Sequence, residues 1–164
     1  MKAGFLIFFL VTAITNQNVK ADSYLQQFDK VAYYHILKSG STAEINNEIL
    51  LIDASSLDNK DAFAGALLMK KAGLLKVPKE KLANFKKGRI KLETVLKNDS
   101  SNVEYHFLRL IIQEHAPKVV KYSSDLNADA EYIKTNFKNL SPEVQKIVID
   151  YSQTSKALKP EDFN

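Results

Sequence analysis

The sequence predicts an all-α fold, a compact bundle of six or seven helices packed as antiparallel hairpins. Apolar residues recur at intervals of three and four, which is the period of a helix. The alternation of apolar and polar residues that marks a strand is almost absent. Residues that break helices are scarce, because glycine occurs only 5 times in 164 residues and no proline precedes Pro78.

Residues 1–21 have the three parts of a cleavable secretory signal. A positively charged start precedes an apolar run at 5–14, and a polar stretch follows it. Val19 and Ala21 are small enough for cleavage, so we expect the mature chain to begin at Asp22. The alternative is an uncleaved membrane anchor, which is disfavoured because a spanning helix needs about 20 apolar residues. The signal predicts export to the periplasm or the medium.

Removing the first 21 of 164 residues leaves 143, the size of one domain. We expect a single helical domain at 22–164, with a loose tail at 159–164. Without cysteine the chain has no disulfide, which is typical of a bacterial envelope protein rather than a small exported eukaryotic domain. The formal charge falls from +4 to +2 when the two lysines of the signal are removed, so no nucleic-acid partner is expected.

The first two expected helices meet at Gly40. The first is expected at 23–38. It should end before Gly40, because glycine favours the backbone conformation of a helix end. Ser41 and Glu44 then form a capping box, in which a hydroxyl and a carboxylate satisfy free N–H groups. This box predicts a second helix at 41–54.

A third helix is expected at 58–75, with Asp58 as its cap. Small side chains surround Gly65 in this segment. A glycine inside a helix costs about 1 kcal/mol relative to alanine, so we expect Gly65 to mark the close approach of a neighbouring helix. Pro78 predicts the start of a fourth helix, extending to about Lys97, because proline prefers the first helical position.

A second capping box at 101–104 predicts a fifth helix that ends near His115. A sixth helix is expected at 128–139. The Ser-Pro-Glu sequence at 141–143 predicts a last helix, extending to about Leu158, because it combines a cap, a proline and an acid at the positive helix end. The apolar positions of these helices give an expected core of Phe28, Val31, Ile49, Phe63, Leu67, Leu82, Phe85, Leu92, Phe107, Leu110, Ile111, Ile133, Val144 and Ile147.

Two resemblances follow from longer motifs. The segment at 80–113, which contains LETVLKNDSSNVEYHFL, resembles the junction of two tetratricopeptide repeats. It covers about one repeat period without a second copy, so it predicts hairpin geometry alone. The segments DAFAGALLMKKA (61–72), NVEYHFLRLIIQEHAPK (102–118) and LSPEVQKIVIDYSQTSKALKPEDF (140–163) resemble a family of small exported helical proteins, without assigned activity, from Bacteroidetes-type bacteria. This resemblance implies an envelope setting and supplies no catalytic residues.

One polar line runs along the expected fifth helix. It comprises Asn102, His106, Arg109 and Gln113, which are spaced so that their side chains stack on one face. One interpretation is the wall of a polar pocket, in which Arg109 binds an anion. The favoured alternatives are a solvent-facing stripe, or an Arg109 that is paired with an acid of a neighbouring helix.

Cations concentrate around the expected fourth helix. They include Lys79, Lys86, Lys87, Arg89 and Lys91. One interpretation is attraction to anionic lipid, lipopolysaccharide or an acidic partner. The favoured alternative is a solvated helix face, because aromatic residues barely interleave with the cations.

No catalytic motif is present, and no cofactor or metal is expected because the histidines lack the spacing of metal ligands. The leading expectation is an exported binding or scaffold protein of the bacterial envelope, which recognises another envelope protein or an anionic surface. The alternative is a small-molecule or lipid carrier with a pocket beside the helix at 102–115. A hydrolase-type enzyme is third, since it requires His106 and Arg109 to converge with a carboxylate.

Overall fold

The computed structural model describes residues 28–163, in which the chain forms seven α-helices and three short 3₁₀ helices. No strand occurs among these residues, so the predicted all-α fold is confirmed. The predicted signal at 1–21, with its cleavage site between Ala21 and Asp22, lies outside the described residues. The elements are α1 (Lys30–Ser39), α2 (Thr42–Ala54), α3 (Lys60–Leu74), α4 (Pro78–Asn98), α5 (Val103–His115), η1 (Lys118–Val120), α6 (Leu126–Asn136), η2 (Phe137–Asn139), α7 (Pro142–Ser152) and η3 (Pro160–Phe163).

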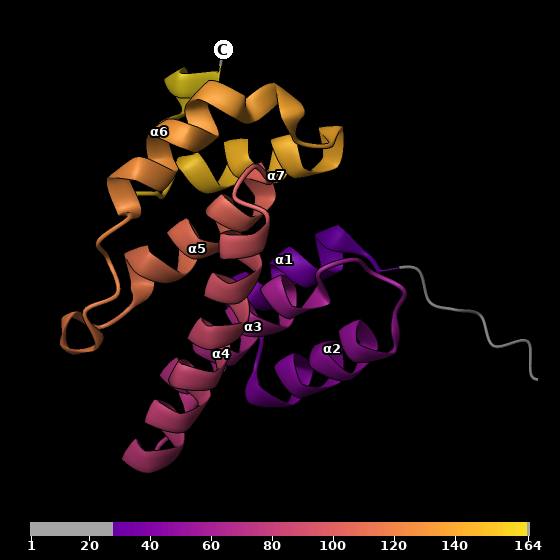
Figure 1. The fold of residues 1–164 in the computed structure, drawn as a ribbon, viewed down its shortest axis with the longest axis vertical. Coiled ribbons are helices and arrows are strands. Elements are labelled where there is room, and N and C mark those ends of the chain that lie inside the picture. Colours follow the sequence, from indigo (N-terminus) through magenta and orange to yellow (C-terminus); the bar gives the residue numbers. More distant parts are fainter. Residues whose placement is uncertain (1–27, 164) are drawn as a thin grey trace, which may run out of the picture.

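Helix α5 contacts α3, α4 and α6, and so joins the α3–α4 hairpin to α6 (Figure 1). Phe107, Leu108 and Leu110 are fully buried, as expected for a helix that is apolar over most of its circumference. The first and last α-helices also touch, because α1 packs against α7. Within the described residues, every helix is too short or too polar to cross a membrane.

Helices α3 and α4 form the most extensive hairpin and cross where two glycines face each other. A Cβ atom added to Gly65 would lie 2.7 Å from the carbonyl oxygen of Gly88 and 2.9 Å from the backbone nitrogen of Leu92. One added to Gly88 would lie 2.9 Å from the backbone nitrogen of Met69. The close approach predicted from Gly65 is therefore confirmed, and Gly88 is its counterpart on α4.

The helix ends agree in part with the predicted caps. The capping box of α2 is present, since Ser41 N donates to the Glu44 carboxylate at 2.7 Å and Glu44 N donates to the Ser41 hydroxyl. Helix α1 begins at Lys30, because Asp29 caps it by accepting from Ala32 N at 3.0 Å, and the predicted start at 23 lies outside the described residues. Asp58 is not the cap of α3, which begins after Asn59 in a left-handed conformation.

The ends of the later helices differ from the predicted ends where polar groups form hydrogen bonds other than the predicted ones. The cap of α5 is Asn102, which accepts from Glu104 N at 3.0 Å, so no capping box forms there. Helix α7 is capped by Ser141 as predicted but ends at Ser152. It stops short of Leu158 because Glu114 of α5 accepts the backbone N–H groups that follow, those of residues 156 and 157, at 2.8 Å.

Two features of the predicted packing are wrong. Val31 and Leu82, expected in the core, are 54% and 51% exposed. Residues 160–163, expected in a loose tail, form η3 instead. This segment is held because the ring of Phe163 packs against that of Phe137 at a tilt of 39°, with ring centroids 4.6 Å apart. Most of the other predicted core residues are buried, and Phe28, Ile49 and Ile147 pack half-buried against the core.

Candidate functional site

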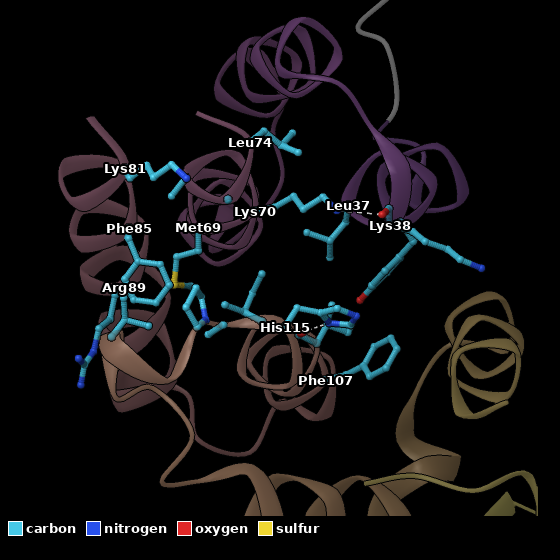
Figure 2. A pocket seen from close by; sticks show the side chains of 18 of the residues that line it. Leu37, Lys38, Met69, Lys70, Leu74, Lys81, Phe85, Arg89, Phe107 and His115 are labelled. Carbon is cyan, nitrogen blue, oxygen red and sulfur yellow. Dashed lines mark hydrogen bonds between the residues drawn. The ribbon is translucent and has the colours of Figure 1, made fainter. Parts of the chain in front are cut away.

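A cleft of about 920 Å³ opens beside α5. It is bounded by α1, α3, α4, α5 and α7, and by the segment at 116–120. Figure 2 shows Phe85 of α4 and Leu37 of α1 on opposite sides of the cleft, with Met69 of α3 between them. All three side chains are buried, so the floor of the cleft is apolar.

The mouth of the cleft carries apolar side chains that remain exposed to water. Val31 of α1, Leu74 of α3, Leu82 of α4 and Val119 of η1 all line it and are among the most exposed large hydrophobic residues. Exposed apolar residues that gather in one concave place mark an interaction site more often than the same residues scattered singly. The errors at Val31 and Leu82 thus have a common cause, since both side chains lie on apolar helix faces that the cleft leaves open.

Cations surround this apolar surface. Lys81, Lys86 and Arg89 line the cleft from α4, and Lys38 and Lys70 line it from α1 and α3. The ammonium group of Lys70 donates to the carbonyl oxygen of Lys38 at 2.9 Å. Asp150 is the acidic residue of the lining. The cleft therefore combines apolar walls with a positively charged rim, an environment that favours anions with an apolar part.

An aromatic group closes the cleft towards α7. Tyr34, Phe107 and Tyr151 line it, and Phe107 packs edge-on against Tyr151 with ring centroids 5.5 Å apart. The Tyr34 hydroxyl donates to Glu104 at 3.3 Å, and the Tyr151 hydroxyl donates to Glu114 at 2.5 Å. Burial, together with these carboxylates, raises the pKa of both phenols. Because the hydroxyl groups are engaged elsewhere, the rings present carbon to the cleft.

His115 also lines the cleft from the end of α5. Its Nδ1 atom lies 2.8 Å from the carbonyl oxygen of Ile111. A carbonyl oxygen can only accept a hydrogen bond, so Nδ1 must carry a proton in this contact. The other ring nitrogen, Nε2, is the atom of His115 that remains for a ligand.

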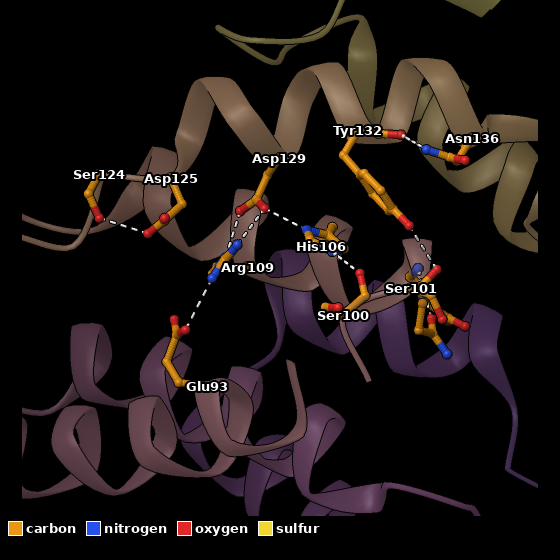
Figure 3. Close-up of polar contacts among 12 residues, drawn as sticks. Glu93, Ser100, Ser101, His106, Arg109, Ser124, Asp125, Asp129, Tyr132 and Asn136 are labelled. Atoms are coloured by element: carbon orange, nitrogen blue, oxygen red, sulfur yellow. Dashed lines mark hydrogen bonds and ion pairs between the residues drawn. The ribbon is translucent and has the colours of Figure 1, made fainter. Parts of the chain in front are cut away.

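The polar line of α5 faces away from the cleft, towards α6. Arg109 binds Asp129 through two contacts of 2.7 Å, and His106 Nδ1 lies 2.7 Å from the same carboxylate (Figure 3). His106 Nε2 lies 2.9 Å from the carbonyl oxygen of Ser100. This is the arrangement in which Arg109 is paired with an acid of a neighbouring helix. It differs from a pocket wall, since none of these side chains lines the cleft.

The network around Arg109 also holds residues of α4 that line the cleft. The guanidinium group reaches Glu93 of α4 at 3.1 Å, and Glu93 accepts from the Tyr122 hydroxyl at 2.5 Å. The ring of Tyr122 packs edge-on against Phe85 at 5.6 Å and lies 5.0 Å from the guanidinium carbon of Arg89. Both Phe85 and Arg89 line the cleft, so Arg109 positions one of its walls without touching its interior.

The remaining residues of the polar line have other roles. Asn102 caps α5, whereas Gln113 is buried with no hydrogen-bond partner for either amide atom among the described residues. His106 and Arg109 do converge with a carboxylate, which the enzyme hypothesis required. However, both side chains already contact Asp129, and their other contacts are Glu93 for Arg109 and the carbonyl oxygen of Ser100 for His106. This geometry is that of a structural clamp.

The predicted basic surface divides into parts with different surroundings. Lys86 and Arg89 line the cleft, whereas Lys79 and Lys87 are exposed outside it. Lys91 forms an ion pair with Asp61 of α3. Across residues 28–163, no group of three or more histidine, aspartate or glutamate residues is arranged to hold a metal ion.

The sequence predicted a pocket beside the helix at 102–115 as one alternative, but it did not indicate which residues line the cleft, because the lining comes from segments that are far apart in the chain. Lys38, Lys70 and Lys81 each look like an ordinary surface lysine in its own helix. The available signal was the excess of apolar residues near cations, as at Leu82 beside Lys81. It becomes informative only when the packing of α3 on α4 is known.

No protein-family model matches the chain, and comparisons with curated proteins and with solved structures also find no match. The resemblance to a family of small exported helical proteins therefore stays a prediction.

Proposed function

We propose that this protein binds a single-chain amphiphile with an anionic head group, such as a fatty acid or a lysophospholipid, in the cleft beside α5. The observation that carries the proposal is the combination of exposed apolar side chains with a cationic rim in one concavity. The volume of about 920 Å³ suits the proposal, because pockets for small molecules measure about 300–1,000 Å³. With the predicted signal at 1–21, the protein would be an exported carrier.

The apolar part of the ligand would occupy the floor of the cleft. Burial of hydrocarbon contributes about 0.8 kcal/mol per methylene group, so a long chain gains most of its affinity there. Leu37, Met69 and Phe85 provide a floor without free polar groups. Such a surface holds hydrocarbon chains without selecting a particular length.

The head group would lie at the rim formed by α4. Lys86 and Arg89 are one helical turn apart on this rim, with Lys81 nearby. Arg89 is held by the ring of Tyr122, which limits its rotation and orients its guanidinium group. A carboxylate or a phosphate would pair with these cations at the water-exposed end of the chain.

The site can be tested by adding a side chain to the cleft and measuring how tightly a fluorescent fatty-acid probe still binds. The probe is used below its critical micelle concentration. Gly73 lines the cleft, and a Cβ atom built there meets no atom within 4 Å. Gly73→Trp should therefore fill the cleft without disturbing the fold. We expect its affinity for the probe to fall at least about tenfold, which is about 1.4 kcal/mol.

The matched control for this variant is Leu50→Trp. Leu50 is 66% exposed on α2 and does not line the cleft, so the same tryptophan should leave probe binding unchanged. Circular dichroism melting curves would establish that both variants fold. If Gly73→Trp is folded and binds the probe as tightly as the unmodified protein, the cleft is not the binding site.

The role of the rim is tested by reversing its charge. Lys86→Glu with Arg89→Glu should weaken binding of the anionic probe about tenfold or more, and should leave binding of its uncharged methyl ester nearly unchanged. Lys79→Glu with Lys87→Glu is the matched control, because it makes the same charge change on the same helix outside the cleft. Equal effects of the two double variants would show a general charge effect and contradict a specific head-group site.

The leading expectation from the sequence, a scaffold that binds another protein, predicts a different result in these assays. An amphipathic helix with an acidic edge would also complement apolar walls and a cationic rim. In that case an acidic amphipathic peptide would bind and be blocked by Gly73→Trp, while the fatty-acid probe would not bind. We prefer the amphiphile because the floor of the cleft is concave and free of polar partners for a peptide.

A further inference from the structure

One loop of this protein exposes an apolar side chain between two cations. Val119, in η1, is 85% exposed, more than any other large apolar residue among the described ones. Lys118 and Lys121 flank it and are exposed as well. Figure 1 shows this segment as a loop that projects from the body of the protein between α5 and α6.

The loop is built to hold this shape. Lys121 has a left-handed backbone (φ 46°), which turns the chain at the end of η1. The next residue, Tyr122, is buried and anchored through its hydroxyl to Glu93. On the other side, Pro117 ends α5 and restricts the backbone before η1. Val119 is therefore presented from a loop that is fixed at both ends.

The loop also forms part of the mouth of the cleft. Val119 and Val120 line the cleft, as do Leu82 and its neighbours Lys81 and Lys86 on α4. The mouth thus displays apolar side chains flanked by lysines from two separate elements. No acidic residue occurs in the segment at 116–121.

We propose that the η1 loop, with the adjoining part of α4, docks on an anionic lipid surface and opens the cleft towards it. This deepens the proposed function and rests on it, because an amphiphile dissolved in a membrane would then enter the cleft without crossing water. Apolar side chains that insert at the interface, with lysines at the level of the head groups, are the usual means by which soluble proteins bind such surfaces.

Vesicle flotation tests the docking surface with vesicles of phosphatidylglycerol and phosphatidylcholine, and with vesicles of phosphatidylcholine alone. We expect the unmodified protein to float with the anionic vesicles and to be released at about 0.5 M salt, because screening weakens the attraction. The neutral vesicles should bind it much less. Equal binding to both kinds of vesicle would overturn the proposal.

The decisive variant is Lys118→Glu with Lys121→Asn. Neither residue lines the cleft, and asparagine tolerates the left-handed backbone at position 121. We expect the affinity for anionic vesicles to fall at least about tenfold, while binding of the soluble fatty-acid probe changes less than about twofold. Lys138→Glu with Lys146→Asn makes the same charge change outside the loop and the cleft, and should float like the unmodified protein.

Vesicle flotation and probe binding together distinguish the docking surface from the amphiphile site on which it rests. A loop variant that floats like the unmodified protein overturns the docking surface. So does an unmodified protein that binds the soluble probe but neither kind of vesicle, and in that case the amphiphile site in the cleft stands. Binding to anionic vesicles through the loop without any binding of the probe would support the docking surface and contradict the amphiphile site.

Discussion

The guanidinium group of Arg109 contacts both carboxylate oxygens of Asp129, with Nε–Oδ2 and Nη2–Oδ1 distances of 2.7 Å. The side chain of Asp129 is only 1% exposed, so this bidentate pair lies inside the protein. Burial lowers the pKa of Arg109, but the hydrogen bonds and the charge of Asp129 outweigh this and raise it above its ordinary value. Because Arg109 also reaches Glu93, one side chain of α5 fixes both α4 and α6.

Replacing Asp129 should therefore destabilise the fold strongly. Asp129→Ala leaves a buried guanidinium group without its main partner, and such losses cost about 3–5 kcal/mol. The measurement is urea unfolding followed by circular dichroism. Glu131→Ala is the control, since its ion pair with Lys134 is exposed (74% for Glu131) and should contribute less than about 1 kcal/mol. Similar losses for the two variants would mean that the clamp is no stronger than a surface pair.

A single methyl group at the crossing of α3 and α4 should also be costly. In Gly88→Ala the new Cβ would lie 2.8 Å from Met69 Cγ and 2.9 Å from the Met69 backbone nitrogen, so the helices must move apart. We expect a net loss of about 2 kcal/mol in the free energy of unfolding, even though alanine favours the helix. Gly73→Ala should instead gain about 0.5–1 kcal/mol, because a Cβ there meets no atom within 4 Å.

The local signals of the sequence predicted the helices well because they act within a few residues. The capping box at Ser41, the start at Pro78 and the small residues around Gly65 each depend on neighbours in the chain. Predictions failed where a partner came from elsewhere in the fold. The last helix ends early because Glu114 binds the backbone at 156–157, and no pattern near that end reveals this contact.

Gln113 offers a way to stabilise the protein. Neither amide atom of this buried side chain has a hydrogen-bond partner among residues 28–163, and an unsatisfied buried polar group costs about 1–3 kcal/mol. Gln113→Met keeps the length of the side chain and removes its polar atoms, so we expect a gain of about 1 kcal/mol in urea unfolding.

The control for this gain is Gln145→Met, which removes a 2.8 Å hydrogen bond from Gln145 Nε2 to the carbonyl oxygen of Leu140. It should lose about 1 kcal/mol rather than gain it. A loss of stability in Gln113→Met would indicate that the amide of Gln113 does make hydrogen bonds in solution.

The buried tyrosines predict the response of the protein to alkali. Burial raises the pKa of Tyr33, Tyr34, Tyr122 and Tyr151 above that of a free phenol, and nearby carboxylates add to this effect. A phenol whose pKa is higher in the folded state contributes stability that is complete below about pH 10, the ordinary tyrosine pKa, and is lost as the pH rises further. Stability should therefore be insensitive to these groups below that pH and fall above it.

The measurement is the ultraviolet absorbance of tyrosinate, recorded together with circular dichroism as the pH is raised. We expect most of the tyrosinate signal to appear cooperatively with the loss of helix. Tyr122→Phe should reduce the cooperative part, because it removes one of the buried phenols. A gradual titration of all tyrosines near pH 10 in protein that remains helical would contradict the burial of these four side chains.

The candidate site was less predictable than the fold. The sequence singles out Arg109 as a candidate, but its partner Asp129 is on another helix, and Arg109 does not line the cleft. Val31 and Leu82 have the periodicity of core residues, and only the arrangement of several helices leaves them open to water. A helix pattern reports which face is apolar, and it does not report whether another element covers that face.

The contact between α1 and α7 has a consequence for how the protein folds. It joins helices near the two ends of the described residues, so most of residues 28–163 lie in the loop that this contact closes. Closing a long loop costs chain entropy before the packing of the two helices is gained, which slows folding relative to a series of local hairpins. A chain made from its N-terminus therefore holds an incomplete core until α7 has been synthesised, and its helices should then unfold and refold as one cooperative unit.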